Sequence, residues 1–137
     1  MATVSTISEP DEGSLYDQVG GDEGVRRLVD AFYDIMDVDA DLAVLRGLHG
    51  DSLDSARDKL YWFLSGWMGG PDLYVQQFGH PRLRARHLPF AIDSTARDQW
   101  VICMGRAMQQ VALPEPLSDR LLHAFYGVAD WMRNREG

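Results

Sequence analysis

One histidine, His87, lies in a segment whose residue types restrict its geometry. The segment reads His80-Pro81-Arg82-Leu83-Arg84-Ala85-Arg86-His87-Leu88-Pro89-Phe90. Proline is tolerated in the first turn of a helix, and Pro89 pushes the residue before it out of helical geometry. These rules predict a helix of barely two turns that ends around His87. Such a helix presents a single imidazole nitrogen from a stiff support, which is what a metal ligand requires.

Composition limits the other kinds of chemistry. The chain has 137 residues, 45% of them hydrophobic, which suits one domain with one core. Its only cysteine, Cys103, excludes an internal disulfide and any multi-cysteine zinc or iron–sulfur site. A net charge of -8 argues against a nucleic-acid partner. No apolar run of roughly 18 residues and no secretory signal are found, which predicts a cytoplasmic protein without a membrane partner.

Helical periodicity extends over most of the chain and strand patterns are nearly absent, which predicts an all-α fold. We expect residues 1–13 to form a flexible N-terminal extension and residues 14–137 to form the domain. The predicted elements are a short helix over 14–18, a long helix over 22–37 capped by Asp22, one or two turns over 40–48, a helix to Trp67 capped by Asp51 or Ser52, a loop over 72–79, the histidine helix, a helix to Ala112 capped by Asp93 or Ser94, and a last helix through Leu117 and Met132.

A short histidine helix after a long loop fits poorly with a bundle of four equal helices. Several landmarks, in their order along the chain, resemble the second group of truncated haemoglobins. They are Leu15-Tyr16-Asp17-Gln18-Val19-Gly20-Gly21, Phe32-Tyr33, Trp67-Met68-Gly69-Gly70-Pro71, the block from Gly79 to Phe90, and Arg97-Asp98-Gln99-Trp100. The resemblance covers roughly residues 14–134. It implies a truncated globin, a two-over-two α-helical sandwich around haem b.

The resemblance also implies roles for individual residues. Taken alone, a histidine at a helix end more often bonds to the backbone, but the matching block makes His87 the proximal iron ligand. Tyr33 and Trp100 become polar residues on the distal side, and Ala56 and Leu60 line the distal helix. A phenol hydroxyl and an indole N–H both donate hydrogen bonds, so they would stabilise bound dioxygen and slow its release.

The junction between the first two long helices leaves two alignments open. One places His49 over the haem, and a shift of one residue places Leu48 there instead. We favour His49, which would add a titratable donor whose charge changes near neutral pH. If its side chain points outward, His49 is a solvated loop residue.

The arginines of the histidine block are candidate partners for the haem carboxylates. Arg84, three residues before His87, lies on nearly the same helical face and is the first choice, with Arg86 the second. Either arginine could equally belong to a solvated basic face. Phe90, at the end of the block, is included among the residues that contact the cofactor.

The predicted function is a haem globin that binds dioxygen, carbon monoxide or nitric oxide at a five-coordinate ferrous iron. An alternative is a nitric-oxide dioxygenase or a peroxidase-like enzyme that depends on an external reductase. A second alternative is a helical sensor or interaction module that uses no metal. The protein is expected to be a monomer or a homodimer.

Overall fold

The protein is all α-helical over residues 13–135, the part of the chain that the computed structural model describes. The predicted extension over 1–13 lies outside this range except for Gly13, as do residues 136 and 137. The elements in chain order are α1 (Leu15–Val19), α2 (Gly21–Val38), the 3-10 turn η1 (Ala40–Leu42), α3 (Ala43–Gly47), α4 (Asp54–Trp67), α5 (Leu73–Phe78), α6 (Leu83–His87), α7 (Ser94–Gln110) and α8 (Glu115–Trp131). The predicted fold class is confirmed. Among these helices, none is long and apolar enough to cross a membrane.

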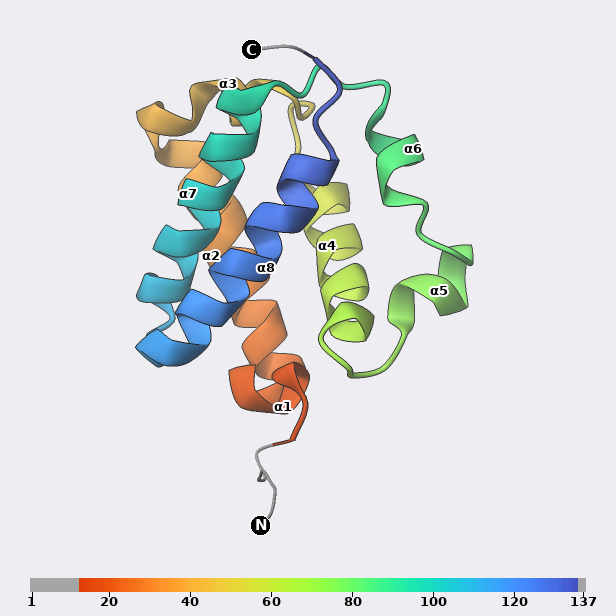
Figure 1. Cartoon of the computed structure of the whole chain (residues 1–137), viewed down its shortest axis with the longest axis vertical. Coiled ribbons are helices and arrows are strands. Elements are labelled where there is room, and N and C mark those ends of the chain that lie inside the picture. The colour runs from red at the N-terminus through yellow and green to blue at the C-terminus, as the bar shows by residue number, and fades with distance from the viewer. Residues whose placement is uncertain (1–12, 136–137) are drawn as a thin grey trace.

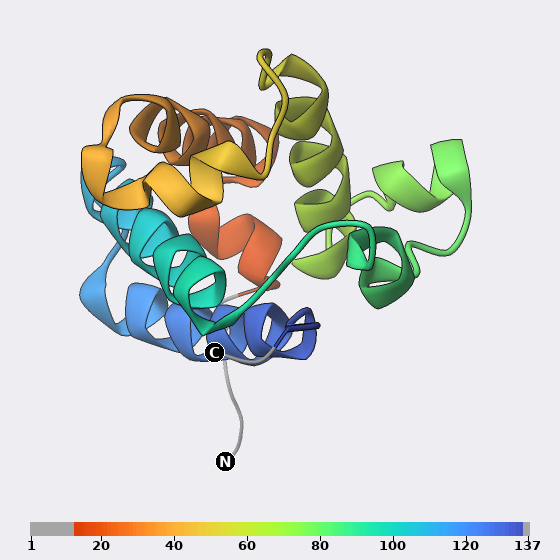
Figure 2. The same ribbon diagram turned by 90° about the horizontal axis from the view of Figure 1, so that it is seen from above.

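The four long helices form two layers (Figure 1). Helices α2 and α4 pack together in one layer, α7 and α8 pack together in the other, and α2 also contacts α7 across the layers. Seen from above, the two layers lie on opposite sides of the molecule, whereas α5 and α6 stand apart beyond α4 (Figure 2). This is the two-over-two arrangement that the resemblance to truncated haemoglobins implies.

The core lies between α2, α4, α7 and α8. Phe32, Leu64, Met104 and Leu121 are almost completely buried there. Cys103 is also buried, and its thiol donates a hydrogen bond to the Phe32 carbonyl oxygen at 3.1 Å. Burial raises the pKa of this thiol to about 12, so it stays protonated and packs as an apolar group.

Helix starts agree only in part with the predicted caps. The Asp93 carboxylate accepts a hydrogen bond from the Ala96 backbone N–H at 2.9 Å, so this predicted cap of α7 is correct. The predicted Asp22 cap is wrong, because α2 begins one residue earlier after Gly20, which has φ 109°. The Asp22 carboxylate instead accepts a hydrogen bond from the Tyr61 hydroxyl and so ties α2 to α4.

The N-terminus of α4 also differs from the prediction. Neither Asp51 nor Ser52 occupies the cap position, which belongs to Leu53 and has no side-chain hydrogen bond. The Ser52 hydroxyl accepts a hydrogen bond from the Asp54 backbone N–H at 3.2 Å. Ser52 therefore shapes the turn before the helix rather than capping it.

The segment predicted as a loop over 72–79 contains a helix, α5. Its buried residue is Tyr74, whose ring lies 4.9 Å from the ring of Phe78, and Phe78 in turn packs on Trp62 of α4 at 5.8 Å. A helix of six residues shows too little periodicity to be recognised, and aromatic contacts with α4 stabilise it.

The glycines of α2 and α8 give a test of how closely α1 approaches α2. A Cβ on Gly24 would lie 1.9 Å from the Val19 carbonyl oxygen, whereas a Cβ on Gly127 would meet nothing within 4 Å. We expect Gly24→Ala to lower the free energy of unfolding by about 1–3 kcal/mol through overpacking. Gly127→Ala should raise it by about 0.5–1 kcal/mol. Urea unfolding of both variants checks this, and equal effects would contradict the close contact.

Candidate functional site

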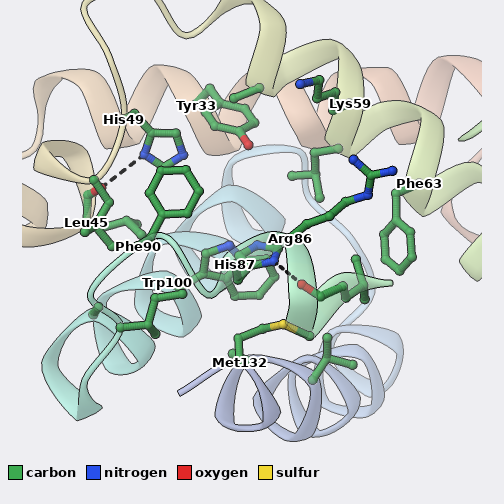
Figure 3. A pocket seen from close by; sticks show the side chains of 18 of the residues that line it. Tyr33, Leu45, His49, Lys59, Phe63, Arg86, His87, Phe90, Trp100 and Met132 are labelled. Atoms are coloured by element: carbon green, nitrogen blue, oxygen red, sulfur yellow. Dashed lines mark hydrogen bonds between the residues drawn. The ribbon is translucent and has the colours of Figure 1, made fainter. Parts of the chain in front are cut away.

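A cavity of about 780 Å³ opens between the two layers and is closed on one side by α6. Cofactor sites typically have volumes of roughly 300–1,000 Å³ with mostly apolar walls. Figure 3 shows His87 on one side of this cavity and Tyr33 and His49 on the other. The cavity therefore brings together most of the residues that the sequence singles out.

His87 is the last residue of α6, and its ring lines the cavity. Its Nδ1 lies 2.6 Å from the carbonyl oxygen of Leu83, one turn earlier (Figure 3). A carbonyl oxygen only accepts hydrogen bonds, so Nδ1 carries the proton and Nε2 keeps its lone pair. An imidazole oriented by a backbone carbonyl in this way is the usual form of a histidine that binds a metal.

The histidine helix starts later than predicted. Arg82 has φ 49°, a left-handed conformation, so α6 begins at Leu83 rather than near Pro81. The Arg82 backbone N–H donates to Nδ1 of His80 at 3.1 Å, and this bond braces the turn. The helix is thus five residues long, and Pro89 follows its end.

Tyr33 and Trp100 are both in the cavity wall. Tyr33 is 5% exposed, and burial is the main cause that raises its pKa above the ordinary value, so the phenol stays protonated. The Trp100 ring is held between Phe32 and Phe125, with ring centroids at 5.2 and 5.5 Å. Within residues 13–135, neither the Tyr33 hydroxyl nor the Trp100 indole N–H has a hydrogen-bond partner. Buried donors such as the Tyr33 hydroxyl are normally paired, and Trp100 is half-buried in the same wall, so both groups are available to a ligand in the cavity.

His49 and Leu48 both line the cavity, so the two alignments left open by the sequence are both represented in its wall. His49 lies edge-on to Tyr33, with ring centroids 5.9 Å apart, and its Nδ1 is 3.1 Å from the Leu45 carbonyl oxygen. Burial lowers the pKa of His49, the hydrogen bond to the Leu45 carbonyl oxygen opposes this, and the charges of Arg46 and His87 lower the pKa further. His49 is therefore expected to gain its positive charge at a more acidic pH than the sequence suggests.

Helix α4 turns a partly exposed apolar face to the cavity. Ala56, Leu60, Phe63 and Trp67 line it and are only half-buried, although their spacing predicts a core-facing stripe. Phe90 also lines the cavity and is 44% exposed. An apolar helix face directed at open space is what a bound apolar cofactor would cover.

The two predicted arginines have different surroundings. Arg86 lines the cavity, and its guanidinium lies 5.7 Å from the centre of the Tyr74 ring. Arg84, the first choice from sequence, is not in the cavity wall. Its guanidinium donates hydrogen bonds to the carbonyl oxygens of Trp131 and Arg133, both at 3.2 Å. The reason is that Arg84 points toward the end of α8 rather than along the His87 face.

Sequence reasoning missed further residues of the wall. Lys59 lines the cavity and lies three residues after Ala56, a spacing that could have placed it on the same face of α4. Tyr74 comes from the unrecognised helix α5, Val128 comes from α8, and Met132 is the C-cap residue of α8. Lys59 and Arg86 supply positive charge to the cavity, and neither forms an ion pair among the residues described.

Taken together, the residues of the cavity fit haem. One imidazole with a free Nε2 is suited to iron, apolar side chains suit a porphyrin, and two cations without an ion pair among the described residues suit its carboxylates. The unpaired hydroxyl of Tyr33 and N–H of Trp100 suit a polar ligand on the side away from His87.

Comparisons with known proteins agree with this geometry. The family model of bacterial-like globins matches residues 14–134. Group 2 truncated hemoglobin YjbI of Bacillus subtilis (strain 168) is 41% identical over 93 residues, 68% of each chain. The group II 2-on-2 hemoglobin of Agrobacterium tumefaciens superposes with a TM-score of 0.88 at 34% identity, covering 93% of this chain and 98% of that one. The truncated oxygen-avid haemoglobin from Bacillus subtilis gives 0.81 at 34% identity, covering 89% and 100%. The chain therefore belongs to the bacterial-like globins, as a truncated haemoglobin of the second group.

Proposed function

We propose that the protein binds haem b through His87 and holds dioxygen, carbon monoxide or nitric oxide in a polar distal cavity. One observation carries the proposal: Nδ1 of His87 donates to the Leu83 carbonyl oxygen at 2.6 Å while the ring lines the cavity. Because the proton is on Nδ1, the nitrogen left for a metal is Nε2. Haem held by one neutral imidazole keeps its opposite coordination position for a diatomic ligand.

Arg86 and Lys59 are our candidates for the partners of the two haem carboxylates. Both line the cavity, and both are free of ion pairs among the described residues. Arg84 supports the site differently, since two of its nitrogens donate to carbonyl oxygens at the end of α8 and just beyond it, whereas Arg86, within the described part of the chain, donates only through Nε, to the Pro81 carbonyl oxygen. It fixes α6, and with it His87, against the C-terminal segment.

Tyr33 and Trp100 favour tight binding of a ligand that gains negative charge. Dioxygen does so on binding, whereas carbon monoxide gains little, and donors in a dry site stabilise such charge strongly. The name of one relative describes that protein as oxygen-avid. A protein that releases oxygen slowly suits a reaction of the bound oxygen better than delivery.

The same unpaired donors favour nitric-oxide dioxygenation as a second candidate function. Such an activity requires a reductase supplied from outside the described domain to restore ferrous iron. Stopped-flow mixing of the oxygenated protein with nitric oxide, under repeated turnover with a reductant, distinguishes this activity from binding alone. A single turnover that cannot be repeated would favour binding.

Replacement of His87 tests the haem site. We expect His87→Gly to lose the Soret band of the purified protein and to regain it when imidazole is added, because imidazole replaces the missing side chain. The matched control is His123→Gly, since His123 is exposed on α8 and does not line the cavity. The control should keep its Soret band. A variant without His87 that holds haem as firmly as the original chain would contradict the proposal.

Removal of the distal donors tests the ligand side. We expect Tyr33→Phe and Trp100→Phe each to raise the rate of dioxygen release by about 10–100-fold, because a hydrogen bond to a charged group contributes about 1.5–3 kcal/mol. Carbon monoxide release serves as the control and should change little. Flash photolysis and stopped-flow displacement measure both rates. Equal changes for the two ligands would point to altered packing instead.

The lowered pKa of His49 predicts a dependence of stability on pH. The folded-state pKa of His49 lies below the ordinary value of about 6.5. As the pH falls through about 6.5, His49 therefore binds a proton more readily in the unfolded chain than in the folded one. The free energy of unfolding of the haem-free protein should therefore decrease because of His49 as the pH is lowered from about 7.5 to about 5.5. Urea unfolding should show a smaller loss of stability for His49→Gln than for the original chain. Parallel losses would show that burial does not perturb this imidazole.

A further inference from the structure

The two histidines of the cavity occur in the same sequence pattern. Leu45-Arg46-Gly47-Leu48-His49 repeats the spacing of Leu83-Arg84-Ala85-Arg86-His87, with leucine, arginine and histidine at matching positions. Each histidine ends or follows a helix of five residues, α3 or α6. In both, Nδ1 of the histidine lies within hydrogen-bond distance of the carbonyl oxygen of the leucine four residues earlier.

This contact fixes the tautomer of His49. The Leu45 carbonyl oxygen, 3.1 Å from Nδ1, can only accept a hydrogen bond, so Nδ1 carries the proton. Figure 3 shows the other ring nitrogen turned away from Leu45, on the side where Tyr33 lies. The neutral His49 ring therefore presents the lone pair of Nε2 to the cavity, so it is a proton acceptor there and not a donor.

Gln99 holds the Leu45 peptide that sets this orientation. Leu45 lies in the first turn of α3, where backbone N–H groups lack partners within the helix. Its N–H donates instead to Oε1 of Gln99 in α7 at 2.9 Å. Gln99 is next to Trp100 in the chain, so α7 carries both a cavity donor and the residue that anchors the His49 peptide.

Arg46 braces the turn on the other side of His49. Its guanidinium donates to the carbonyl oxygens of Gly50 and Asp51 at 2.8 and 2.9 Å and forms an ion pair with Asp37 at 3.0 Å. The residues before and after His49 are thus both tied to fixed groups. A ring held in this way does not exchange its donor and acceptor nitrogens freely.

We propose that His49 accepts the proton of weak-acid ligands, such as hydrogen cyanide or hydrogen peroxide, and that Gln99 is the positioning residue that keeps Nε2 available for this. The proposal rests on the proposed function, because the ligand must have a haem to bind. In the step, the H–X bond breaks, the proton goes to Nε2 and the electron pair stays on X. The products are the anion X⁻ and a protonated His49, so atoms and charge balance.

This acceptor distinguishes weak acids from ligands without a proton. Carbon monoxide has no proton to transfer, so His49 gives it no such assistance. A positioned base contributes about 100-fold or more to a proton transfer. The site therefore combines two donors that stabilise the developing anion, Tyr33 and Trp100, with one acceptor, His49, for the proton that the ligand loses.

The test compares hydrogen cyanide with carbon monoxide on the haem-loaded protein at neutral pH. For the ferric protein, we expect His49→Leu to slow cyanide association by about 100-fold and Gln99→Leu to slow it by about tenfold. Gln99→Glu retains an oxygen that accepts from the Leu45 N–H and should restore most of the rate. Gln109→Leu, on the exposed part of α7, is the matched control and should change nothing. Carbon monoxide association with the ferrous forms should stay within about twofold.

The second readout is independent of ligand rates. Two-bond ¹H–¹⁵N spectra of the diamagnetic carbon monoxide form should show His49 with the proton on Nδ1 in the original chain, and mixed tautomers in Gln99→Leu. Three results would overturn the proposal: a proton on Nε2 in the original chain, a cyanide rate unaffected by His49→Leu, or iron ligation by His49 itself. Failure to take up haem or carbon monoxide would instead refute the proposed function, so the two failures are distinguishable.

Discussion

The site depends on a helix that is too short to be stable alone. Helix α6 has five residues, and isolated helices of this length do not persist in water. Tertiary hydrogen bonds supply what is missing: Asn134 Nδ2 donates to the His87 carbonyl oxygen at 3.2 Å, and Arg84 donates to the carbonyl oxygens of Trp131 and Arg133. Asn134 also exchanges hydrogen bonds with Ile92, after the end of the histidine block. The position of the imidazole is therefore set by the segment that follows α8, and the Leu83 carbonyl sets only its rotation.

The molecule also has an open interior, lined by α4, α6 and α8 among other elements. Helix α4 packs on α2 and α8 packs on α7, but α4 and α8 do not pack closely on each other, and α5 and α6 stand beyond α4 (Figure 2). Leu64 and Leu121 are buried in the protein core, whereas Leu60, Phe63 and Val128 border the cavity and remain partly exposed. One helix thus contributes to two different apolar environments. The sequence marks these positions only as apolar. It does not show whether side chains or a bound cofactor would cover them.

Features that depend only on neighbouring residues could be predicted from the sequence, whereas features that depend on tertiary contacts could not. The long helices, the Asp93 cap and the end of α6 follow from local periodicity, capping and proline geometry, which require only neighbouring residues. The sequence named Arg84 before Arg86, yet Arg86 is the one that lines the cavity. Two residues along a helix change the direction of a side chain by more than half a turn, so α6 has to be placed before the two arginines can be ranked. Helix α5 depends on contacts of Phe78 with Trp62, which no local pattern reveals.

The polarity of the cavity follows from where backbone carbonyl oxygens lie. His87 and His49 each direct their N–H to a leucine carbonyl oxygen, so both present a lone pair and neither presents a proton to the interior while neutral. Apart from the cations Lys59 and Arg86, the donors available to a ligand include Tyr33 and Trp100, whose hydroxyl and N–H have no partner within residues 13–135. Burial keeps the phenol protonated and the His49 ring neutral, so the separation of two acceptors from two donors holds around neutral pH. A leucine four residues before each histidine thus determines, through its carbonyl oxygen, which nitrogen of the imidazole carries the proton.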